Sequence, residues 1–176
     1  MTRLAAFAAP VLLLVYGLSR WADGLDGDRG NGLAWDAGHV AFFLAFVSLA
    51  ALVIGLRRMT GRPPWLMNAA AAAALFGAGC FLWVIAGDLS PAFHDAAPLP
   101  EVLQLIGPVL FQLGALTLLV RLAAAGRLPF WTPALVLLAF VAIAVDLDLI
   151  PVAAVLLGAG LAPVAMRHET AVAARR

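Results

Sequence analysis

The stretch Asp146-Leu147-Asp148-Leu149-Ile150-Pro151 decides the fold, because it interrupts the last apolar region of the chain. Apolar residues fill positions 131–145 before this stretch and positions 150–166 after it. A single span that held two carboxylates and a proline near its centre would be very costly in lipid. We therefore expect a hairpin of two short helices with its turn at Asp146, in preference to one long helix broken in the middle.

The composition excludes an ordinary water-soluble domain. Of the 176 residues, 64% are apolar and 12% are charged, and the mean hydropathy is +1.01. Soluble proteins are about half apolar and about a quarter charged. A membrane-spanning helix takes about 20 residues, so the chain has room for at most about six or seven spans. No room is left for a separate catalytic or nucleic-acid-binding domain, and the expected surroundings are the lipid bilayer.

Six apolar segments emerge along the whole chain. We predict an all-α integral membrane protein, a compact bundle of six transmembrane helices in one domain over residues 1–176. The expected spans are residues 4–21, 36–56, 65–87, 102–122, 131–145 and 150–166. The first span resembles a signal peptide at its start, but no small-x-small cleavage site follows it, so we expect it to be retained.

Charges alternate in sign between successive connections, which predicts the topology. If the N-terminus is cytoplasmic, nine of the 11 basic residues fall on the cytoplasmic side. These are Arg3, Arg57, Arg58, Arg62, Arg121, Arg127, Arg167, Arg175 and Arg176. All the acidic residues except Glu169 fall on the outer side. The positive-inside rule then predicts a multi-pass protein of the bacterial cell (inner) membrane, with both termini cytoplasmic.

Small residues at helical spacing indicate closely packed helices. Ala70, Ala74 and Ala78 share one face of the third span, and Gly158 and Ala162 share one face of the sixth. Such faces let helix backbones approach in lipid. The connections at residues 61–65 and 126–131 also have similar sequences, which favours three helical hairpins in parallel orientation. The alternative is that apolar helices with basic inner loops simply look alike.

Histidines and carboxylates gather on the predicted outer side and form the candidate site. The residues are Asp36, His39, Asp88, His94 and Asp95, with His94 and Asp95 in a predicted loop. Imidazole and carboxylate groups that face one compartment bind divalent metals such as zinc. The simpler interpretation is that Asp36 caps a helix, Asp88 marks a helix end and the histidines contact interfacial water.

Other polar residues admit weaker hypotheses. Only His39 and His94 lie on the same side as a pair of axial haem ligands. Gln104 and Gln112 are eight residues apart in the fourth span, so they either line a polar path or form hydrogen bonds between helices. Cys80 lies in an apolar segment and is expected to be a small buried residue.

These observations leave three classes of function. The favoured class is a structural or regulatory component that acts through helix contacts with a membrane protein partner or with a second copy of the chain. The second is a small carrier or channel, whose acidic outer mouth would attract cations. The third is a membrane enzyme, or a metal or haem protein, that uses the outer histidines and aspartates.

Overall fold

The computed structural model describes residues 1–25, 30, 32–61 and 63–166. This part of the chain is all-α and contains no strand. Its elements are α1 (Thr2–Asp23), α2 (Gly32–Met59), α3 (Pro64–Leu89), α4 (Pro91–Ala96), α5 (Glu101–Ala124), α6 (Trp131–Val145), the 3-10 turn η1 (Leu147–Leu149) and α7 (Ile150–Ala165). The predictions for Arg62, Arg167, Glu169, Arg175 and Arg176 concern residues outside the described ranges.

Five helical segments are long and apolar enough to cross a membrane. They are α1, α2, α3, α5 and the continuous segment Leu147–Ala165. Helix α6 is also apolar, but it has 15 residues. At a rise of about 1.5 Å per residue it is roughly 22 Å long, which is less than the apolar thickness of a bilayer. The prediction of a multi-pass membrane protein is confirmed, whereas the fifth predicted span, residues 131–145, is shorter than an ordinary one.

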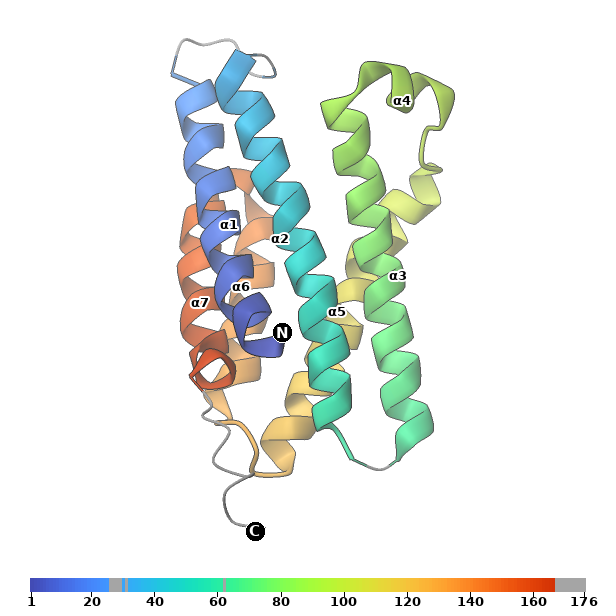
Figure 1. Ribbon diagram of the computed structural model, residues 1–176, viewed down its shortest axis with the longest axis vertical. Helices are drawn as coiled ribbons and strands as arrows, with labels where there is room; N and C mark the ends of the chain where they lie inside the picture. The colour runs from blue at the N-terminus through green and yellow to red at the C-terminus, as the bar shows by residue number, and fades with distance from the viewer. Residues whose placement is uncertain (26–29, 31, 62, 167–176) are drawn as a thin grey trace.

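The helices form a closed ring in which each packs against the next (Figure 1). Around the ring the order is α1, α2, α3, α5, α6 and α7, and α7 packs back against α1. The short helix α4 joins α3 to α5 at the upper end of the view in Figure 1. The predicted all-α fold is confirmed, while the bundle of six spans and the internal sequence repeat stay predictions.

The turn predicted at Asp146 is present. Helix α6 ends at Val145, Asp146 has an extended backbone, and η1 then leads directly into α7. The Asp146 side chain caps the turn by accepting a hydrogen bond from the backbone N–H of Asp148 at 2.8 Å. Because α6 packs against α7, the two helices form the expected hairpin.

Helices α3 and α5 approach each other closely through small residues. A Cβ atom added at Gly77 would lie 2.3 Å from the carbonyl oxygen of Gly107, and one at Gly114 would lie 2.3 Å from that of Ala70. Ala74 is fully buried between these contacts. The alanine face predicted in the third span is therefore a packing face against α5. Cys80 is also buried there, as expected.

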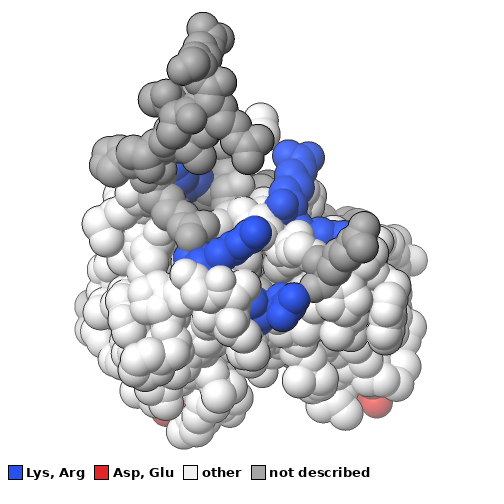
Figure 2. All heavy atoms as spheres, turned by 90° about the horizontal axis from the view of Figure 1, so that it is seen from below, with Lys and Arg blue, Asp and Glu red and all other residues white. Residues whose placement is uncertain are grey.

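The two ends of the bundle carry opposite charge. Among the described residues, the arginines other than Arg20 lie at the lower end, which we call the arginine end (Figure 2). The opposite, acidic end holds the described carboxylates, namely Asp23, Asp36, Asp88, Asp95, Glu101, Asp146 and Asp148. At the arginine end, Arg3 donates to the carbonyl of Ala165 at 3.0 Å and Arg127 donates to that of Met59.

Two local predictions at the acidic end were wrong. Helix α2 begins at Gly32, so Asp36 is an exposed residue within the helix and does not cap it. His94 and Asp95 belong to α4 and not to a loop. This helix forms because Ser90 caps it, accepting a hydrogen bond from the N–H of Phe93 at 3.3 Å, and because Pro91 suits its first position.

Candidate functional site

A cavity of about 250 Å³ lies at the centre of the helix ring and extends toward the acidic end. Every helix of the ring contributes to its wall, and most of the lining side chains are apolar. Six aromatic residues line it: Tyr16, Phe42, Phe46, Phe81, Phe111 and Phe140. The cavity therefore has the mostly apolar wall that is typical of small-molecule sites.

The aromatic side chains contact one another and fix the shape of the cavity. Tyr16 stacks on Phe42, and Phe46 stacks on Phe81, each pair with ring centroids 4.1 Å apart. Phe42 and Phe46 are four residues apart and so lie on one face of α2, with their rings edge to face at 5.2 Å. Such pairs are more favourable than their buried area alone, and they hold the ring faces in defined orientations.

The polar end of the cavity is formed around Asp88, at the end of α3. Asp88 and Tyr16 both line the cavity, and His39 lies directly behind them. His39 is 3% exposed, and its Nδ1 lies 2.9 Å from the carbonyl oxygen of Trp35. Because a carbonyl oxygen only accepts, Nδ1–H donates this bond. The ring is thereby held with Nε2 3.8 Å from Oδ2 of Asp88.

A second pocket of about 170 Å³ lies beneath α4 and meets the central cavity at Asp88. His94 and Gln104 line it, and Asp88 and Val84 line both pockets. Gln104 donates to the carbonyl of Leu99 at 2.8 Å, which ties the start of α5 to the segment after α4. Gln104 and Gln112, for which either a polar path or hydrogen bonds between helices were considered, line two separate pockets with Asp88 at their junction.

The structure brings together only part of the predicted metal site. His39 and Asp88 are paired, and His94 lies near Asp88 across the second pocket. Asp36 and Asp95 are exposed and line neither pocket. Within the described ranges, no group of three or more His, Cys, Asp or Glu side chains is close enough to hold a metal ion. Zinc sites use at least three protein ligands. Binding of a divalent metal or of haem therefore stays a prediction.

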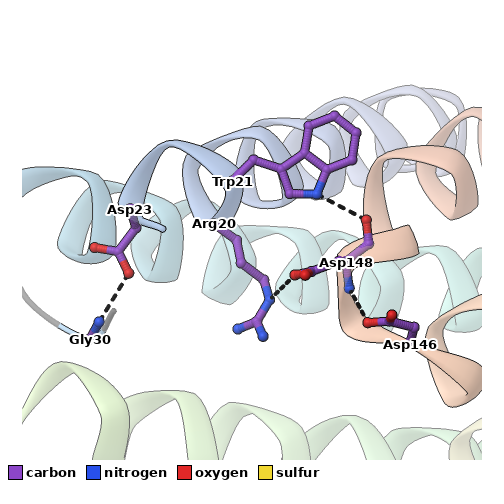
Figure 3. Close-up of polar contacts among 6 residues, drawn as sticks. All are labelled: Arg20, Trp21, Asp23, Gly30, Asp146 and Asp148. Atoms are coloured by element: carbon purple, nitrogen blue, oxygen red, sulfur yellow. Dashed lines mark hydrogen bonds and ion pairs between the residues drawn. The ribbon is translucent and has the colours of Figure 1, made fainter. Parts of the chain in front are cut away.

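The carboxylate of Asp148 serves a different purpose, because it joins the first helix to the last hairpin (Figure 3). Arg20 Nε lies 3.2 Å from its Oδ1, and the indole N–H of Trp21 donates to its backbone carbonyl at 2.9 Å. At the end of α1, Asp23 accepts a hydrogen bond from the N–H of Gly30 at 3.0 Å (Figure 3). Asp88 differs from these carboxylates because it faces the central cavity.

Sequence reasoning missed the aromatic residues of the site. The spacing of Phe42 and Phe46 was the one available signal, but the other rings lie on four other helices. Comparison with known proteins adds no relative: no family model matches the chain, and neither the curated proteins nor the solved structures contain a significant match. The function must therefore be argued from the geometry of this site.

Proposed function

We propose that the protein binds a small, mostly apolar molecule inside its helix bundle, as a binding protein or carrier of the membrane. The observation that supports this most directly is the aromatic cavity, which contacts all the helices of the ring. At about 250 Å³ it is slightly smaller than the usual range for drug-sized ligands, which begins near 300 Å³. It therefore suits a ligand with one or two rings or a short hydrocarbon chain.

The proposal includes an orientation. With the arginine end cytoplasmic, as the positive-inside rule predicts, α6 makes a short fifth crossing of six, and the cavity extends toward the outer side. Local thinning of the bilayer accommodates a span of this length. A phosphatase fused after Arg176 reports the side of the C-terminus. Activity outside the membrane would overturn this orientation, and an inactive fusion beside an active fusion at Asp146 is the expected result.

Binding can be tested with phenylbutanol, a neutral probe with one ring and a short chain. Saturable binding to the protein in lipid nanodiscs, followed by calorimetry, is expected. Ile143→Phe adds a ring to the cavity wall and should weaken binding about tenfold or more, because it fills the space for the probe. Val141→Phe on the exposed face of the same helix is the matched control and should leave the affinity unchanged. If no saturable binding occurs, the proposal is wrong.

The second candidate is the structural role, with a second copy of the chain as partner. A groove of about 410 Å³ runs along the outside of α1 and α7, where Gly158 and Ala162 expose little side chain. Small residues favour close helix contact in lipid. Ala162→Cys, in a Cys80→Ala background, should then form a disulfide-linked dimer in native membranes. Leu113→Cys, on an exposed face of α5, is the control that should not.

A further inference from the structure

We propose that the central cavity selects lipophilic amines, with the ammonium group of the ligand beside Asp88 and its apolar part among the aromatic rings. This inference rests on the proposed function and names the class of ligand for the same site. It is carried by the placement of one carboxylate at the end of a mostly apolar cavity.

Asp88 is available to a ligand. Its side chain is 38% exposed, and its contact with His39 involves only Oδ2, which lies 3.8 Å from Nε2. That separation is longer than a hydrogen bond, so the carboxylate keeps capacity for a stronger donor. Among the described residues, Arg20 is the one arginine at the acidic end, and its guanidinium pairs with Asp148. A primary ammonium group would supply the charge-assisted hydrogen bond that His39 is too distant to make.

The neighbouring rings favour a cation over a neutral or negative group. Tyr16 and Phe42 stack on each other and line the cavity together with Asp88. The faces of aromatic rings attract cations within about 6 Å of the ring centre. An anion would instead meet the carboxylate and the negative ring faces. The apolar part of an amine would continue inward toward Phe111 and Phe140.

The route to the site also favours cations. The pocket beneath α4 reaches Asp88 from the acidic end, where the described carboxylates are concentrated. A surface that carries mostly charges of one sign raises the local concentration of ions of the opposite sign. His94 is the one titratable group other than Asp88 that lines this pocket. Cations would therefore be concentrated near Asp88 before they enter the cavity.

The test compares phenylbutylamine with phenylbutanol, which have the same ring and chain but differ in charge. We expect the wild-type protein in nanodiscs of uncharged lipid to bind the amine about tenfold more tightly, the ratio that one partly buried charge-assisted contact gives. Asp88→Asn should remove this preference, so that the amine and the alcohol bind with similar affinity. Asp95→Asn makes the same change in an exposed residue of the same end and should keep the preference.

The outcomes separate the two proposals. Equal affinity of the wild-type protein for both probes, or an amine preference that survives Asp88→Asn, would overturn the amine inference while the cavity still binds the alcohol. Failure of both probes to bind would overturn the proposed function itself. If Asp88→Asn does not fold, the inference is tested by the preference of the wild-type protein and by that of Asp88→Glu. The glutamate keeps the charge and should keep the preference for the amine. Loss of preference in a folded Asp88→Glu variant would count against the amine site.

Discussion

Gly77→Ala should destabilise the bundle more than the same exchange at an open position, because Gly77 lies in the contact between α3 and α5. The added Cβ would lie 2.3 Å from the carbonyl oxygen of Gly107, and 2.6 Å from the backbone nitrogen of Phe111. Ordinary contacts of a Cβ atom begin near 3.4 Å. The two helices would therefore have to separate by about 1 Å at this point, since neither obstacle is a flexible side chain.

The size of the effect follows from two opposing terms. Overpacking a tightly packed contact costs about 1–3 kcal/mol. Alanine in a helix gains about 0.5–1 kcal/mol over glycine through the lower entropy of the unfolded chain. The net loss expected for Gly77→Ala is thus about 1–2 kcal/mol.

Gly79→Ala provides the matched control, two residues further along the same helix. A Cβ atom at Gly79 meets nothing within 4 Å, so this variant should be neutral or slightly more stable. Reversible unfolding in mixed micelles with increasing detergent denaturant, followed by tryptophan fluorescence, gives the free energy of unfolding of both. Equal stability of the two variants would refute the close approach of α3 and α5 and with it the placement of the cavity wall.

Three further predictions concern other parts of the bundle. Thr132→Val should raise the free energy of unfolding by about 1 kcal/mol in the same assay, because the buried Thr132 hydroxyl has no hydrogen-bond partner among the described residues; a loss of stability would show that the hydroxyl is satisfied. A cysteine at Asp146 should react with an impermeant reagent added from outside, since the turn lies at the acidic end; resistance to labelling would contradict the orientation. If the paired His39 and Asp88 bind zinc together with His94, elemental analysis should find near-stoichiometric metal that is lost in His39→Ala/His94→Ala; no metal in the wild-type protein would end that hypothesis.

The sequence was sufficient to predict the arrangement of the last two helices and the charge of the two ends. The turn follows from the high free-energy cost of placing Asp146 and Asp148 in the apolar layer of the membrane. The charge of the two ends follows from the preference of arginines for one side of the membrane. The contacts of Asp148 with Arg20 and Trp21 were not predictable. They join segments more than 120 residues apart, and nothing in either segment specifies its partner.

The cavity was beyond sequence reasoning for a different reason. In a membrane protein, hydropathy does not distinguish a phenylalanine that faces lipid from one that faces the interior. Phe76 and Phe81 lie five residues apart on α3, yet Phe76 is 50% exposed while Phe81 packs against Phe46 and lines the cavity. Their different roles follow only from the order of helices around the ring. His39 was predicted as a candidate metal ligand, but its burial behind Asp88 depends on that same order of helices.

The position of Asp88 along the membrane normal explains how the bundle can keep a carboxylate beside an apolar cavity. Asp88 lies in the last turn of α3, where the pocket beneath α4 gives its side chain access to polar surroundings. A carboxylate placed deeper, near Phe111, would be far more costly. The result is a site that is charged at its outer end and apolar at its inner end. An amphiphilic amine lies in a bilayer in the same way, with its ammonium group at the surface and its apolar part inward. With the arginine end cytoplasmic, as proposed, such a ligand would have the same orientation in the cavity as in the outer leaflet, with its charge at the outer end.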